Sequence, residues 1–178
     1  MTLRLTLISP ETEDFIMECK IDADATFADL HRFILKHCNF EELQGQRFFV
    51  CDEGWKPVQR ILLGDEDCVN IDEDVYLMHD TELGKFLEDE GQRLTYRFDP
   101  ENRRMLLLEL TETTFGDPVP QSGVLTRRRG TAPRQLLEEE ESFPVQSTAV
   151  MSEELTEEFY GEDGFDDDEI DLEGFDIL

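Results

Sequence analysis

ADATFADLHRFILKHCNF, residues 23–40, decides the fold, because it has the pattern of an amphipathic helix. Its apolar residues recur at intervals of three and four, which places them on one helical face. The residues of that face are Phe27, Leu30, Ile34 and Cys38. Thr26 precedes them and Asp29 follows three residues later, which is the arrangement of a capping box. The sequence therefore predicts a helix that begins after Thr26 and buries one face.

Two runs of alternating apolar residues precede this helix. Leu3, Leu5 and Leu7 form the first run, and the second extends over residues 15–21. Alternation with a period of two is typical of strands with one buried face, and the polar residues 9–14 between the runs fit a turn. The sequence predicts an antiparallel strand pair followed by a helix, an opening similar to that of β-grasp folds.

Further elements are predicted after this helix. Residues 47–53 and 58–63 have the composition of strands, and residues 65–74 form an acidic loop. A second helix is predicted from Asp80 or Thr81 up to Gly91, which would act as its C-terminal cap. The inward-facing residues of this second helix would be Leu83, Phe86 and Leu87.

Two long strands are predicted near the end of the domain. They cover residues 93–99 and 104–112, and residues 99–102 form the turn between them. The continuous apolar run at 105–108 indicates a central strand that is buried on both faces. The predicted fold class is α+β, with a mostly antiparallel mixed sheet and two main helices.

The pattern of regular elements stops after Thr113, and the chain divides into two regions. Residues up to 135 complete a single α+β domain, ending in an irregular segment rich in Pro and Gly. Residues 136–178 form an acidic tail, and the sequence predicts that it is disordered, because its apolar residues are too few to offset the ordering entropy.

Charge limits the classes of partner. The chain has 44 acidic and 16 basic residues, a formal net charge of -28, and no Lys or Arg follows Arg134. Direct binding of nucleic acid is disfavoured, because a polyanion is bound through clustered Lys and Arg. A basic protein partner suits this charge better.

The cellular setting is predicted from the cysteines and from the apolar runs. The four cysteines show no CxxC spacing, so we expect free thiols in the cytoplasm. No secretory signal and no apolar run long enough to span a membrane is visible in the sequence.

Aromatic and aliphatic residues alternate with the acids of the tail. These candidate partner-binding residues are Phe159, Tyr160, Phe165, Ile170, Leu172, Phe175 and Leu178. A tail that only kept the protein soluble would need no such residues. We therefore expect them to dock into a partner while the carboxylates attract its basic surface, although a merely solvating tail remains an alternative.

Asp29, Leu30 and His31 lie together on the first predicted helix, and Tyr96, Phe98 and Asp99 lie near the end of a predicted strand. With these motifs the domain resembles the Ri-plasmid ORF-3-like family, also known as insertion-element passenger TnpR-like proteins. The resemblance covers residues 1–135 and implies an α+β fold and a link to mobile-element gene neighbourhoods, but no established activity. After Asp99 the chain has Pro-Glu-Asn-Arg-Arg where the family has Gly, Asp, Trp and His, so a site at those family positions would be absent here. The motif positions in this chain are Asp29, Leu30, His31, Tyr96, Phe98 and Asp99.

The sequence carries no signature of a catalytic centre. It lacks HExxH, paired CxxC and GxSxG motifs, and it shows no Gly-rich phosphate loop, so we expect no metal, no cofactor and no enzyme activity. Trp55 is expected to pack over the sheet edge. Arg127, Arg128 and Arg129 form the one basic run, which would contact an anion or pair with the chain's own acids.

The leading functional hypothesis is a non-catalytic binding or adaptor domain that engages a basic protein through its acidic tail. The alternative is an accessory factor of mobile-element DNA transactions, one that mimics the charge of DNA. An enzyme of unspecified reaction ranks third. The oligomeric state is left open.

Overall fold

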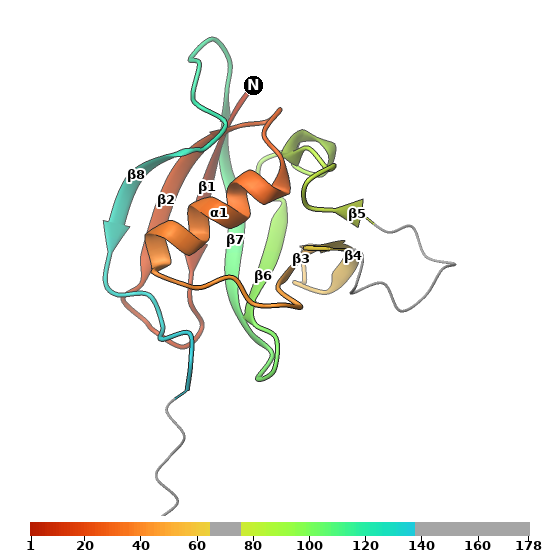
Figure 1. Ribbon diagram of the computed structural model, residues 1–178. Coiled ribbons are helices and arrows are strands. Elements are labelled where there is room, and N and C mark those ends of the chain that lie inside the picture. The colour runs from red at the N-terminus through yellow and green to blue at the C-terminus, as the bar shows by residue number, and fades with distance from the viewer. Residues whose placement is uncertain (65–75, 138–178) are drawn as a thin grey trace, which may run out of the picture. The chain divides into compact units, whose positions relative to one another are not determined.

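An eight-stranded sheet with the order β5-β4-β3-β6-β7-β1-β2-β8 is the framework of the described residues in this computed structural model (Figure 1). Neighbouring strands are antiparallel except β4 and β5, which are parallel. The elements are β1 (Thr2–Ile8), β2 (Ile16–Asp22), α1 (Phe27–Cys38), β3 (Arg47–Cys51), β4 (Pro57–Leu62), β5 (Tyr76–Leu77), the 3-10 helix η2 (Leu83–Lys85), β6 (Arg93–Asp99), β7 (Arg104–Thr114) and β8 (Val124–Arg129).

The structure describes residues 1–64 and 76–137. Cys68, the whole predicted acidic loop and the tail from residue 138 onward lie outside the described residues, as do all seven candidate partner-binding residues of the tail. Within the described part of the chain, no helix is long and apolar enough to cross a membrane.

The predicted opening of two strands and a helix is confirmed. β1 and β2 pair with Leu3 opposite Ile21 and Leu7 opposite Met17, so the alternating apolar residues share one face. The capping box is formed: Thr26 Oγ1 accepts a hydrogen bond from the Asp29 amide at 3.3 Å, and Asp29 Oδ2 accepts one from the Thr26 amide at 2.9 Å. On its other side β1 pairs with β7.

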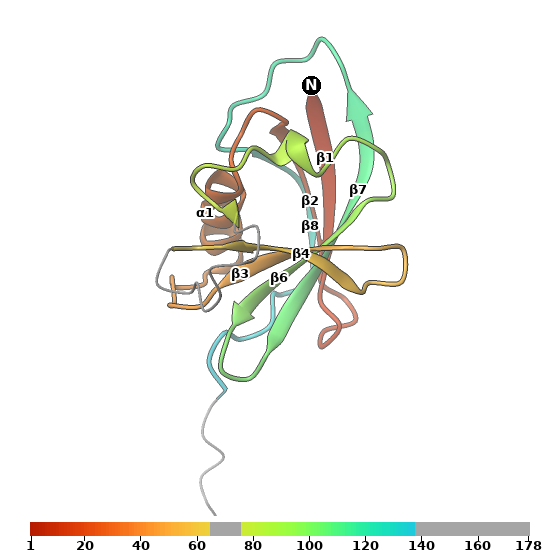
Figure 2. The same cartoon turned by 90° about the vertical axis from the view of Figure 1, so that its right-hand side faces the viewer.

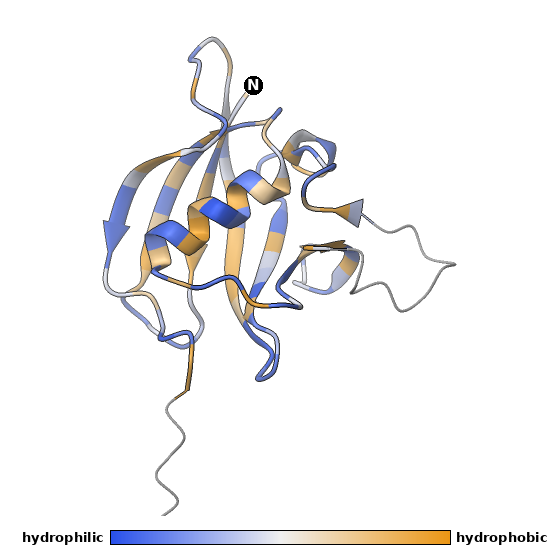
Figure 3. Ribbon diagram, in the orientation of Figure 1, coloured by the Kyte–Doolittle hydropathy of each residue, from blue (hydrophilic) through white to orange (hydrophobic). Residues whose placement is uncertain are grey.

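The core lies between α1 and one face of the sheet. Figure 2 shows α1 on a single side of the sheet, and Figure 3 shows hydrophobic residues along β1, β2 and β7. The apolar face of α1 is buried as the spacing predicted, with Phe27, Leu30 and Ile34 fully enclosed. Burial of such a face provides most of a helix's stability in a protein.

The predicted second helix is wrong. Only the single 3-10 turn η2 forms there, preceded by Glu82 in an extended conformation. Gln92 explains the early end, because its side-chain oxygen accepts the amides of Glu88 and Asp89 at 2.6 and 3.0 Å. Those amides would otherwise extend a helix. Gly91 has the positive φ of 90° expected of a cap, but its amide bonds the Leu110 carbonyl of β7 at 2.7 Å.

Two further predictions need correction. The segment after Thr113 is not irregular throughout, because Val124–Arg129 forms the edge strand β8 beside β2. Residues 105–108 lie in β7, which is central in the sheet as predicted, but only one of its faces is fully buried. Leu106 and Leu108 lie in the core, while Met105 and Leu107 are half-buried on the opposite face, which α1 does not cover.

Candidate functional site

A hydrogen-bonded chain, buried at Tyr96 and His31 and exposed at Glu42, joins α1 to the sheet through two of the motif positions. The Tyr96 hydroxyl lies 2.9 Å from His31 Nδ1, and His31 Nε2 lies 3.2 Å from Glu42 Oε2. Burial raises the pKa of Tyr96, so its hydroxyl is protonated and donates to Nδ1. Nε2 of the neutral ring then carries the proton and donates to Glu42.

Tyr96 and His31 hold the fold and are closed to substrates. Tyr96 is 0% exposed and His31 is 1% exposed. Burial lowers the pKa of His31, while Glu42 opposes that effect, so the ring is neutral at pH 7. A buried polar group is stable only when it is hydrogen-bonded, and these three residues satisfy one another.

The motif residues Phe98 and Asp99 lie at the end of β6 and shape the following turn. Phe98 stacks on Phe40 with ring centroids 4.8 Å apart. Burial alone would raise the pKa of Asp99, but hydrogen bonds from the Asn102 amide and side chain, with Arg104 at 3.4 Å, lower it below its ordinary value. Asp29 caps α1, so the motif positions serve the fold and do not converge on a cavity.

Arg104 fastens the end of the described chain to this turn. Its guanidinium binds both carboxylate oxygens of Glu11 and donates to the carbonyls of Arg134 and Gln135 at 2.7 and 2.9 Å. The segment 131–135 is thereby held beside the end of α1.

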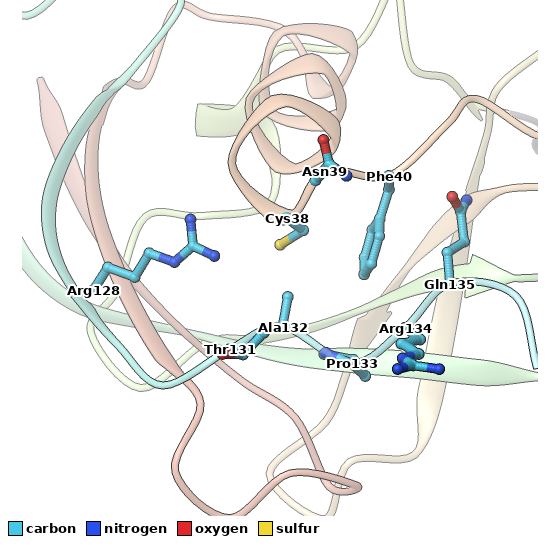
Figure 4. Close-up of a pocket in the computed structure, with 9 residues that line it drawn as sticks. All are labelled: Cys38, Asn39, Phe40, Arg128, Thr131, Ala132, Pro133, Arg134 and Gln135. Atoms are coloured by element: carbon cyan, nitrogen blue, oxygen red, sulfur yellow. The ribbon is translucent and has the colours of Figure 1, made fainter.

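A cavity of about 330 Å³ lies between the C-terminal end of α1 and this segment (Figure 4). Its lining residues come from α1 and the loop after it, from β8 and from the chain that follows β8. They are Cys38, Asn39, Phe40, Arg128, Thr131, Ala132, Pro133, Arg134 and Gln135. We call this space the basic cavity, because it is lined by two arginines and no acid.

The wall of the basic cavity is held by paired hydrogen bonds. Gln135 Oε1 accepts from the Glu41 amide at 2.6 Å, and Gln135 Nε2 donates to the Glu41 carbonyl at 2.7 Å. Gln46 Nε2 also donates to the Glu41 carbonyl, at 3.1 Å, and to the Phe98 carbonyl, at 3.0 Å. The cavity is therefore built on the main chain rather than left between loose side chains.

The three consecutive arginines of β8 point to alternate faces of the sheet, as successive residues of a strand do. Arg127 pairs with Glu18 at 3.1 Å, and Arg129 pairs with Asp14 at 3.7 Å. Arg128 instead points to the end of α1, where its Nη1 donates to the His37 carbonyl at 2.9 Å (Figure 4). Two arginines of the run thus pair with the chain's own acids, while Arg128 lines the basic cavity and its contact with an anion stays a prediction.

Cys38 lies in the wall of the basic cavity but is a poor nucleophile. Burial raises the pKa of its thiol to about 12, although Arg128 acts in the opposite direction. Burial likewise raises the pKa of Cys19 to about 12 and raises that of Cys51. A thiolate is the reactive form of cysteine, so these three buried thiols are inert at neutral pH.

A second cavity, of about 720 Å³, has the opposite charge. It lies between the β3–β4 turn and the turn before β6. Its lining residues are Cys51, Asp52, Glu53, Asp89, Glu90, Gly91, Gln92 and Arg93. We call it the acidic cavity, because four carboxylates and one guanidinium line it.

Trp55 lies beside the acidic cavity, half-buried, on the β3–β4 turn. The Arg93 guanidinium lies 4.9 Å from the centre of its ring, and Arg93 also pairs with Glu109 at 3.2 Å. The one basic residue of the cavity lining is therefore neutralised by Glu109 and stacked on an aromatic ring, which leaves the field of the cavity negative.

The sequence did not single out the residues of either cavity, apart from Arg128. The turn at the end of α1 and the strand β8 bring together Asn39, Phe40 and residues 131–135. Neither the turn segment nor residues 131–135 carry a short sequence motif. Asn39 ends α1 in the left-handed conformation, with a φ of 57°. Asn is one of the residues found at this position, so Asn39 itself is the local sequence signal for the turn. Among the described residues no cluster of His, Cys, Asp and Glu has the arrangement of a metal site.

No family model matches the chain, and no curated protein matches it. The crystal structure of a protein of unknown function, MM3350 from Methanosarcina mazei Go1, is similar to it, with a TM-score of 0.57 and 14% sequence identity. The similarity covers 74% of this chain and 71% of that chain. At this identity it supports the α+β fold with a largely antiparallel sheet, and nothing about activity.

Proposed function

We propose that the protein is a non-catalytic binding module that engages a basic protein partner. The observation that carries this proposal is the segregation of charge. Seventeen of the 44 acids lie from Glu138 onward, where the chain has no Lys or Arg. A region whose charges all have one sign attracts a partner of the opposite charge over a distance of about a Debye length, which is roughly 8 Å at physiological salt.

The acidic cavity of the described residues supports the same proposal. Asp52, Glu53, Asp89 and Glu90 surround a space large enough for a Lys or Arg side chain. Trp55 at its edge offers an apolar surface for the aliphatic part of such a side chain. The folded domain therefore has a feature of its own that favours a basic partner.

Within the proposal, the tail contributes anchors as well as charge. Phe165, Phe175 and Leu178 would insert into a groove of the partner, and the neighbouring carboxylates would contact its rim. Ordering the tail on contact would cost entropy, so the affinity would be modest and sensitive to salt. The three described cysteines are free and buried, which fits our placement of this module in the cytoplasm.

Quantitative affinity capture from native lysate tests the proposal. We expect the full chain to enrich proteins with an excess of Lys and Arg. The Phe165→Ser, Phe175→Ser, Leu178→Ser variant keeps all charges, and we expect its enrichment of these proteins to be at least tenfold lower. If the variant captures the same proteins equally well, the tail acts as a polyanion only. If the captured proteins are no more basic than the lysate, the proposal is wrong.

The acidic cavity has its own variant. Glu53→Gln with Asp89→Asn removes two charges from its lining, and Asp24→Asn with Glu101→Gln removes two exposed charges elsewhere. We expect the first pair to reduce capture and the second to leave it within twofold. Displacement of the captured proteins by duplex DNA would instead favour the DNA-mimic alternative.

A further inference from the structure

The basic cavity contrasts with the charge of the molecule around it. The chain has a formal net charge of -28, yet none of the nine residues that line this cavity is Asp or Glu, and two are Arg. A cationic recess in an anionic protein concentrates small anions that the rest of the surface repels.

We propose that the basic cavity binds the carboxylate of a small monocarboxylic acid with an apolar chain. Arg128 and Arg134 supply the positive charge. Phe40, Ala132 and Pro133 supply an apolar wall for the rest of the ligand. The site shares no residue with the acidic cavity or with the tail, so its existence does not depend on the proposed function.

Arg128 is placed so that it can bind a ligand without losing its own support. A guanidinium has five N–H donors, and the His37 carbonyl accepts from Nη1 at 2.9 Å. This contact directs the guanidinium toward the end of α1, where Figure 4 shows it beside Cys38. A guanidinium held in place loses less entropy when it binds a planar carboxylate through two parallel hydrogen bonds.

Positively charged side chains act on their neighbours at the end of α1. Lys36 and Arg128 both lower the pKa of His37, in addition to the effect of burial. Arg128 also acts to lower the pKa of Cys38. Two neighbouring groups thus respond to positive charge at this end of the helix.

Size and helix polarity favour a monocarboxylate over phosphate. The volume of about 330 Å³ is near the lower limit for ligand pockets, which is about 300 Å³. The C-terminal end of a helix carries partial negative charge on its free carbonyls. This charge opposes the dianionic form of phosphate more strongly than it opposes a single carboxylate. The buried side chains of Phe40 and Pro133 form an apolar part of the lining, which an aliphatic chain can cover and a phosphate cannot.

The test is a titration of the full-length ¹⁵N-labelled protein with isovalerate, followed through the amide resonances. We expect saturable shifts at Cys38, Asn39, Thr131 and Gln135, with a dissociation constant in the millimolar range, on the order of 1–10 mM for so small a ligand. Isovaleramide, which has the same shape without the charge, should bind at least tenfold more weakly.

Matched arginine variants locate the binding site. Arg128→Gln should weaken isovalerate binding at least fivefold. Arg127→Gln, which changes the preceding residue of the same strand and faces Glu18, should change it less than twofold. Unchanged resonances of β1 and β7 would show that each variant is folded.

Three outcomes would overturn the proposal. The first is the absence of shifts at these four amides up to about 50 mM, well above the millimolar affinity expected of such a ligand. The second is equal weakening by Arg127→Gln and Arg128→Gln, which would indicate general charge attraction. The third is tighter binding of inorganic phosphate than of isovalerate, which would make the cavity a phosphate site.

Discussion

The hydroxyl of Tyr96 connects the sheet to α1 through a single hydrogen bond to His31. Tyr96→Phe keeps the ring and leaves buried Nδ1 without a donor. We expect a loss of about 1–3 kcal/mol in the free energy of unfolding, the usual cost of an unsatisfied buried polar group. Urea denaturation measures it. Tyr76→Phe, at a half-buried ring packed on Phe86, should stay within about 0.5 kcal/mol.

His31 also makes stability depend on pH. Burial lowers its pKa in the folded protein below the ordinary 6.5, Glu42 raises it in part, and Arg32 lowers it. As the pH falls through about 6.5, His31 of the unfolded chain therefore takes up a proton, while the buried His31 ring of the folded protein stays neutral to a lower pH. The stabilisation is complete above pH 6.5 and is lost as the pH falls below that value towards the lower pKa of the folded state.

The measurement is the free energy of unfolding at pH 7.5 and pH 5.5. We expect the wild-type protein to lose stability over this interval, and His31→Gln to lose less. His37→Gln provides the comparison, because the pKa of His37 is also lowered and His37 contributes to the same interval. Asp29 and Asp99 have pKa values below 3.8, so they do not contribute in this range. An unchanged pH dependence in His31→Gln would show that the buried ring is not involved.

At the scale of the elements, Gly130 determines how the chain leaves β8. Its φ is +69°, and a Cβ placed there would lie 2.4 Å from the Asp14 carbonyl oxygen. Gly130→Ala should therefore cost roughly 2 kcal/mol or more, from backbone strain and the clash together. It should also increase amide exchange in β8.

Gly116 provides the matched control for that variant. Its φ is +94°, but a Cβ there would meet nothing within 4 Å. Gly116→Ala should cost only the strain of the left-handed conformation, about 1 kcal/mol. Equal losses in the two variants would show that the contact between residue 130 and Asp14 is unimportant.

The elements differ in how well the sequence predicts them, for identifiable reasons. Strong periodicity of apolar residues marks β1, β2, α1 and β6, and α1 also begins with a capping box. The local sequence therefore specifies these elements. β8 was missed because three consecutive arginines replace the alternation, and only pairing with β2 makes the segment a strand. The second helix was wrong because the Gln92 side chain competes for helical amides, a contact that no periodicity reveals.

The candidate site was predicted less well than the fold. The arginine run was recognised, but the sequence could not show that Arg128 alone reaches the end of α1. That follows from the register of β8 on β2, where Arg128 is opposite Met17 of the core face. The acidic cavity joins two turns that are about 40 residues apart along the chain, so only the folded sheet brings its carboxylates together.

In the whole molecule, we expect residues 1–137 to determine stability and residues 138–178 to determine binding of the partner. Every member of the described apolar core lies between Leu3 and Leu110. A chain truncated after Leu137 should therefore unfold within about 0.5 kcal/mol of the full-length protein. Thermal denaturation measures this. A loss of more than about 2 kcal/mol would show that residues 138–178 contribute to the folded core.

The proposed function requires that a basic partner binds through residues 138–178. The most direct measurement is the dissociation constant of a captured partner, determined calorimetrically for the full chain and for the chain truncated after Leu137, at 50 and 300 mM salt. We predict that truncation weakens binding at least tenfold, and that salt weakens binding of the full chain more than that of the truncated chain. Equal dissociation constants for the two chains, or an affinity independent of salt, would contradict the claim.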